Sequence, residues 1–257
     1  MLAQFAVRLI CGMSLVLAAM PHATVASGFF RVQMLIVMGL GVLATLAGQT
    51  PQAPATAIAP WIGQVHQVLC VAMAGLGFLA SVFWMLERRR VGFALLAVIS
   101  VLSLTALSLG ILLISGTWRL HWSCVFASDL SSALTLGGAM CGMLLGHSYL
   151  TSPTMSIAPL LKLNEFLGWA GVVRGLISGA VLLVAWPQLH GDSTWIWLTL
   201  RWIAGIGGPL LVWQMVKRIL VFKNTQAATG VLFVGVILTL LGELTGTLLL
   251  AVTGYPL

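Results

Sequence analysis

Charged residues are scarce in this chain: Asp, Glu, Lys and Arg make up 7% of its 257 residues, against about 25% in soluble domains. Hydrophobic residues make up 60%, which is more than the core of a soluble protein could bury. The composition therefore excludes an ordinary soluble domain and predicts an all-α polytopic membrane protein. The net charge of +7 comes from a few basic residues between apolar runs, which favours contact with anionic lipid and argues against nucleic-acid binding.

Catalytic and metal-binding motifs are also missing. The sequence has no phosphate-binding glycine loop, no HExxH motif and no GxSxG motif, so it does not indicate a self-contained hydrolase or ATPase. The four cysteines have no metal-ligand spacing, and we therefore predict neither a metal site nor a disulfide: Cys11, Cys70, Cys124 and Cys141.

Apolar segments of near-spanning length fill the chain, given that about 20 helical residues cross a bilayer. We mark eight, at residues 4–25, 29–48, 63–86, 91–115, 124–150, 166–187, 195–218 and 230–252. Residues 1–28 partly resemble a signal peptide, but their basic start is weak, so we expect a retained first helix. The segments predict one membrane domain over residues 1–257, built as two four-helix bundles.

The basic residues predict the orientation of the chain. Six of the twelve lysines and arginines lie in two loops, at positions 88–90 and 217–223, which share one face of the membrane if there are eight spans, and Arg31 and Lys162 lie on the same face. The positive-inside rule places this face in the cytoplasm. The sequence therefore predicts a bacterial-type inner membrane protein with both termini in the periplasm.

Five ionisable residues within or directly beside the apolar segments stand out, because an unpaired charge in lipid is costly: Asp129, Glu165, Arg174, Arg201 and Glu243. A rise of about 1.5 Å per residue places Asp129, Arg201 and Glu243 at similar depth in the outer half of the membrane. Opposite charges at one depth can pair, which offsets part of the desolvation cost. The same counting places Glu165 and Arg174 in the inner half.

Two histidines lie near the ends of segments. His66 begins the third segment on the outer side and joins the layer of Asp129, Arg201 and Glu243 as the candidate site. His147 ends the fifth segment on the cytoplasmic side and is interpreted as an interfacial polar residue. Haem b needs two histidines at matched depth on facing helices, so haem b is not expected.

Eight spans, both termini outside, a polar layer in the outer half and no haem ligand pair resemble the membrane anchors of polysulfide and dimethyl sulfoxide reductases. The resemblance is one of topology and charge placement along the whole chain. It implies a quinone-binding subunit of a redox complex, without its own cofactor, that exchanges electrons with an iron–sulfur partner. Quinone chemistry also moves protons, which side chains of the candidate site could donate or accept: His66, Asp129, Arg201 and Glu243.

Two other functions fit the same residues. A small transporter could use Arg201 and Glu243 as a proton- or solute-coupled pair, and the helix break at residues 207–209 favours it, although the chain has no visible internal repeat. Alternatively, the charges only hold helices in register, in a structural or assembly subunit. Lipid and other membrane protein subunits are the partners expected.

Overall fold

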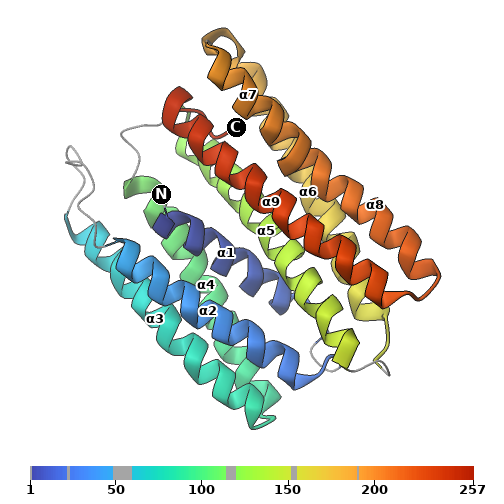
Figure 1. Cartoon of the computed structure of the whole chain (residues 1–257). Helices are drawn as coiled ribbons and strands as arrows, with labels where there is room; N and C mark the ends of the chain where they lie inside the picture. The colour runs from blue at the N-terminus through green and yellow to red at the C-terminus, as the bar shows by residue number, and fades with distance from the viewer. Residues whose placement is uncertain (1, 22–23, 49–59, 114–119, 152–154, 190) are drawn as a thin grey trace. The chain divides into compact units, whose positions relative to one another are not determined.

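The computed structural model describes residues 2–21, 24–48, 60–113, 120–151, 155–189 and 191–257. Every regular element in this part of the chain is helical, which confirms the predicted fold class (Figure 1). Among the described residues, seven helices are long and apolar enough to cross a membrane, and an eighth is apolar but shorter. The chain divides into two compact units, residues 1–116 and 117–257, between the fourth and fifth predicted segments.

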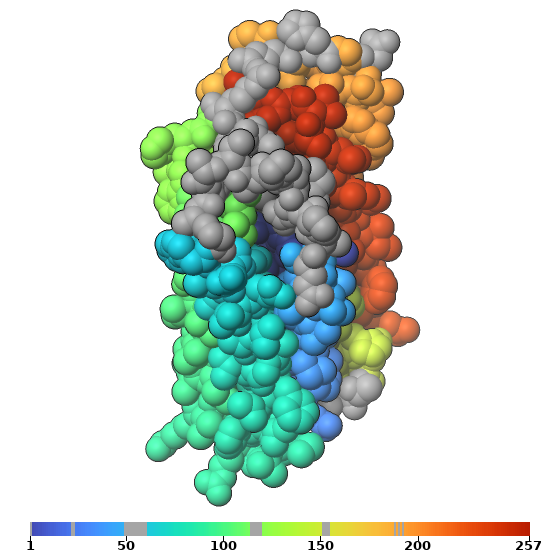
Figure 2. Space-filling view, turned by 90° about the vertical axis from the view of Figure 1, so that its left-hand side faces the viewer, coloured from blue at the N-terminus to red at the C-terminus, as the bar shows by residue number. Residues whose placement is uncertain are grey.

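The described part of the first unit contains four helices: α1 (Leu2–Ala18), α2 (Ser27–Gly48), α3 (Pro60–Met85) and α4 (Arg89–Leu113). Figure 2 shows α2 and α3 lying side by side. Their backbones approach closely at Gly41, which has no side chain. A Cβ there would lie only 2.8 Å from the Ala74 nitrogen. The hydroxyls of Ser14 on α1 and Ser103 on α4 lie 3.3 Å apart. Close packing and uncharged polar contacts thus join these helices.

Helix α1 is shorter than the first predicted segment. It ends at Ala18, and its 17 residues correspond to about 25 Å of helix, less than the hydrocarbon core of a typical bilayer. Pro21 follows shortly after, and its ring would clash with the carbonyl four residues earlier in a continuing helix.

The described part of the second unit contains three long helices and one interrupted helical rod. The long helices are α5 (Trp122–Thr151), α6 (Ala158–Ala185) and α9 (Thr225–Thr253), and a short turn, η2 (Trp186–Gln188), follows α6. The rod consists of α7 (Asp192–Leu200), the π-helical turn η3 (Arg201–Gly207) and α8 (Gly208–Val221). A π turn inside an α-helix is rare and is frequently found at functional sites.

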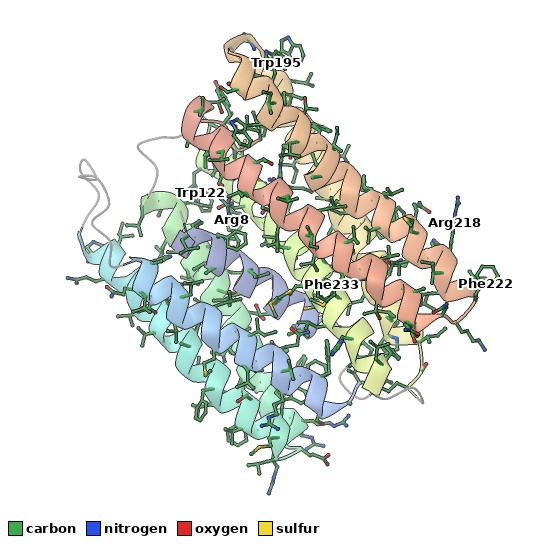
Figure 3. All side chains as sticks on the ribbon, in the orientation of Figure 1. Arg8, Trp122, Trp195, Arg218, Phe222 and Phe233 are labelled. Carbon is green, nitrogen blue, oxygen red and sulfur yellow. The ribbon has the colours of Figure 1, made fainter. Side chains whose placement is uncertain are left out.

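The two ends of the rod differ in chemistry. Trp195 lies near the start of α7, where its ring meets Trp186 edge-to-face with centroids 5.4 Å apart. Arg218 and Phe222 project at the opposite end (Figure 3). Phe233, on α9, is also exposed on the apolar surface of this unit. Exposed apolar side chains along a helix, with aromatic and basic residues at its ends, are typical of a lipid-embedded span.

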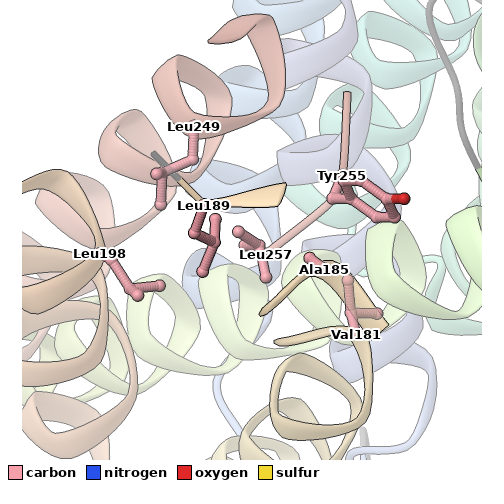
Figure 4. Close-up of a cluster of buried hydrophobic side chains, with 7 residues drawn as sticks. All are labelled: Val181, Ala185, Leu189, Leu198, Leu249, Tyr255 and Leu257. Atoms are coloured by element: carbon pink, nitrogen blue, oxygen red, sulfur yellow. The ribbon is translucent and has the colours of Figure 1, made fainter. Parts of the chain in front are cut away.

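The end of the chain folds back onto the second unit. Gly254 ends α9 with φ 75°, a left-handed conformation that favours glycine. The chain then buries Tyr255 and Leu257 in a hydrophobic cluster shown in Figure 4, with Val181, Ala185, Leu189, Leu198 and Leu249. This arrangement brings the last residues close to the buried charges described next.

Candidate functional site

The carboxylate of Glu243 on α9 is the centre of a buried charged group in the second unit. Arg201 Nη1, from η3, donates to Glu243 Oε1 at 2.9 Å. Arg174 Nε, from α6, lies 3.6 Å from the same oxygen. The hydroxyl of Ser132, from α5, donates to Oε2. We call these four residues the Glu243 cluster, since one carboxylate meets side chains from three other helical elements.

Arg174 connects the Glu243 cluster to the end of the chain. Its Nη1 donates to the Ser128 carbonyl at 3.0 Å and lies 2.7 Å from the Ser128 hydroxyl and 3.4 Å from the Ser131 hydroxyl. The Ser128 hydroxyl in turn donates to the carbonyl of Pro256 at 3.0 Å. Arg174 is therefore held by α5 as well as by Glu243.

Two glycines allow η3 and α9 to meet at the cluster. A Cβ on Gly205 would lie 2.8 Å from the Gly242 Cα and equally close to Arg201 Nη1. Real Cβ atoms do not approach a backbone this closely, so larger residues here would force the two elements apart. The close approach places Glu243, which follows Gly242, within reach of Arg201.

Burial makes these contacts strong and makes their loss costly. Arg201 is 0% exposed, Glu243 2% and Arg174 3%. Removing one partner of a buried pair costs about 3–5 kcal/mol, because the remaining charge keeps its desolvation penalty. Asp129, on α5, is also buried, so the buried acidic and basic side chains described in this unit are equal in number.

The structure brings together Arg201 and Glu243, as equal depth predicts. The placement of Arg174 in a separate inner layer is wrong. That placement assumed a helix starting at residue 166, but α6 begins at Ala158 with proline in its first turn. Arg174 is therefore about 17 Å of helix from the end of α6 at Ala185, and Glu243 is about 15 Å from the end of α9 at Thr253, so the two residues can lie at similar depth.

The other predicted residues have separate surroundings. His66 lies buried on α3 in the first unit, where its Nδ1 is 3.9 Å from Cys70 Sγ. His147 is exposed near the end of α5. Glu165 pairs with Lys217 at 2.9 Å, and both side chains are well exposed, at 40% and 52%. The grouping of His66 and Asp129 with the Glu243 cluster stays a prediction.

Sequence reasoning missed the serines of α5 and one buried charge of the first unit. Ser128, Ser131 and Ser132 flank Asp129, and this density of hydroxyls around an intramembrane carboxylate is the signal that could have found them. Arg8, on α1, is buried at 7% exposure, although it resembles the basic start of a signal peptide in sequence.

The described residues contain no group of three or more His, Cys, Asp or Glu side chains that could hold a metal ion. Comparison of the chain with protein-family models, with curated proteins and with solved structures found no match. Fold and site together define a multi-span helical membrane protein with a buried Arg–Glu–Arg cluster in one of its two units.

Proposed function

We propose that the chain is a quinone-interacting subunit of a membrane electron-transfer complex, with the ligand bound at the Glu243 cluster. The observation that carries the proposal is a titratable carboxylate contacted by two arginines and a serine, all buried within a lipid-embedded helical unit. Burying an ionisable group inside a membrane bundle costs free energy. Such groups almost always face the interior of the bundle, and they mark ligand sites or proton pathways.

The chemistry of quinones fits these groups. A quinone carries an apolar ring and tail that partition into lipid, and its carbonyl oxygens accept hydrogen bonds. An arginine of the cluster donates to one oxygen, while Glu243 accepts a proton released when bound quinol is oxidised. Each quinol gives up two protons and two electrons, so the proposal requires a partner subunit that carries the electrons away. Asp129, which is buried on the same helix as Ser132, completes the proposed proton route.

The proposal includes the location of the protein. We place it in a bacterial-type inner membrane, with the basic loops at 88–90 and 217–223 in the cytoplasm and both termini in the periplasm. This orientation puts the ligand site in the outer half of the bilayer, where the topology-level resemblance to polysulfide and dimethyl sulfoxide reductase anchors would also place it.

A solute transporter is the second candidate. The observation that favours it is the π-helical turn at Arg201–Gly207, which interrupts the helix that carries Arg201 and is followed by Gly208 and Pro209. Interrupted helices frequently form the substrate sites of secondary transporters. In that reading, Arg201 and Glu243 separate and pair again as the substrate passes.

The test is quinone binding by the full chain, purified in mild detergent with every subunit that travels with it. Titration with a short-chain quinone, followed by quenching of tryptophan fluorescence, should show saturable binding that is about tenfold weaker in Glu243→Gln. Glu165→Gln, which removes an exposed carboxylate, is the matched control and should bind as the unaltered chain does.

The alternatives give different results. The protein is a transporter, and the quinone proposal is wrong, if the folded chain shows no saturable quinone binding and moves solute in liposomes in a way that depends on Glu243. The Glu243 cluster has a structural role if the unaltered chain shows neither quinone binding nor solute flux and Glu243→Gln loses the copurifying subunits.

A further inference from the structure

One edge of the Arg201 guanidinium is left without a partner. Nη1 is used by Glu243, whereas Nε and Nη2 have no hydrogen-bond partner among the residues that the structure describes. Arg201 is completely buried. The N–H groups of Nε and Nη2 lie side by side on a planar group and form a two-donor fork, which matches a pair of adjacent acceptor oxygens.

A buried fork of this kind points to a ligand. Leaving a buried donor unpaired costs about 1–3 kcal/mol, and more for a charged group. Buried polar groups in folded proteins are therefore nearly always paired. The two unpaired donors on this buried, charged edge are explained if a ligand with acceptor oxygens occupies the edge in the bound state of the protein.

Gly246 lies directly beside the fork. It lies on α9, three residues after Glu243 and on the same face of the helix. A Cβ at this position would lie 3.4 Å from both Nε and Cζ of Arg201 and 3.3 Å from the main-chain oxygen of Leu257. These distances allow a methyl group with a small adjustment, but that methyl would occupy the space beside Nε.

The charge balance favours a neutral ligand. The buried ionisable side chains described in the second unit are two acidic and two basic: Asp129, Glu243, Arg174 and Arg201. An added carboxylate would leave a net negative charge inside the bilayer, where charge is costly. Two adjacent acceptor oxygens on an uncharged molecule satisfy the fork without that penalty.

We propose that the Arg201 fork selects quinones that carry an alkoxy oxygen next to a ring carbonyl. The carbonyl oxygen accepts from one N–H of the fork and the neighbouring alkoxy oxygen from the other. A ring with alkyl groups at those positions offers one acceptor only and leaves the second donor unpaired. This inference rests on the proposed function and names the substrate class of the same site.

The test compares two short-chain benzoquinones on the full chain with its copurifying subunits. One probe is a dimethoxybenzoquinone, and the other is its diethyl analogue, which has nearly the same shape. The unaltered chain should bind the dimethoxy compound about tenfold more tightly, the factor expected for one hydrogen bond to a charged donor. The preference should disappear in Arg201→Lys, because an ammonium group has no planar fork.

Gly246→Ala tests the same site without changing a charge. Its methyl should remove the preference while leaving the fold intact. Gly230→Ala is the control on the same helix, because a Cβ there meets nothing within 4 Å, and it should keep the preference.

The outcomes separate this inference from the proposed function. Equal binding of both quinones by the unaltered chain overturns selection by the fork but leaves quinone binding in place. A preference that survives in both Arg201→Lys and Gly246→Ala overturns the assignment to the fork. Binding of neither quinone by the folded chain overturns the proposed function, and this inference with it.

Discussion

In the first unit, α1 meets α4 through two serine hydroxyls and α2 meets α3 at Gly41, whereas in the second unit four helical elements meet around the carboxylate of Glu243. Among the described residues, the first unit buries one charged side chain, Arg8, and the second buries four. Small-residue packing is sufficient to hold helices together in lipid, where dispersion contacts replace the hydrophobic effect. The second unit therefore adds buried charges to the kind of packing on which the first unit relies.

The largest effect should follow from breaking the cluster. Glu243→Gln leaves Arg174 and Arg201 buried without a carboxylate, and we expect the free energy of unfolding to fall by about 3–5 kcal/mol. Reversible unfolding in mixed micelles, followed by circular dichroism, measures this loss. Glu165→Gln removes an exposed ion pair and should cost less than about 1 kcal/mol. Similar losses in the two variants would contradict the buried network.

A second change tests the close approach that positions the cluster. Gly242→Ala puts a methyl against the backbone of Gly205, where no side chain can move aside. We expect a loss of about 1–3 kcal/mol, the range for overpacking. The same unfolding assay measures it, and an unchanged stability would show that η3 and α9 lie farther apart than described.

The corresponding change in the first unit should act through packing alone. Gly41→Ala places a methyl 2.8 Å from the Ala74 nitrogen and should cost about 1 kcal/mol. Gly39→Ala, on the same helix, meets nothing within 4 Å and should stabilise by about 0.5–1 kcal/mol, because alanine favours the helix. Opposite signs in the unfolding assay are the expected result; equal signs would argue against this register of α2 and α3.

The smallest effect belongs to an uncharged hydrogen bond in the first unit. Ser103→Ala removes the contact with Ser14 and should cost about 0.6 kcal/mol, the average for such bonds between membrane helices. A loss as large as that of Glu243→Gln would remove the contrast between the two units. Unfolding of both variants under identical conditions provides the comparison.

Depth counting along the sequence was sufficient to predict that Arg201 and Glu243 meet, because polar residues mark the ends of both spans and the count to Arg201 runs along α7, before the π turn begins. It failed for Arg174 because Lys162 and Asn164 make the first turns of α6 look like a loop, which shifted the predicted start by eight residues.

The π turn and the contact of Ser132 with Glu243 were not predictable by this route. A π turn depends on how η3 packs against α9, and glycine-rich sequence is compatible with several helical geometries. Serines in membrane helices often bond to their own backbone, as Ser131 does to the Ser128 carbonyl, so their presence alone does not identify a partner on another helix.

The most direct test of the buried network is a double-mutant cycle between Arg201 and Glu243. Unfolding free energies are measured for Arg201→Met, Glu243→Gln, the double variant and the unaltered chain. Contact at 2.9 Å without exposure predicts a coupling of about 1.5–3 kcal/mol. Additive effects, with a coupling below about 0.5 kcal/mol, would show that the two side chains do not interact and would contradict the site.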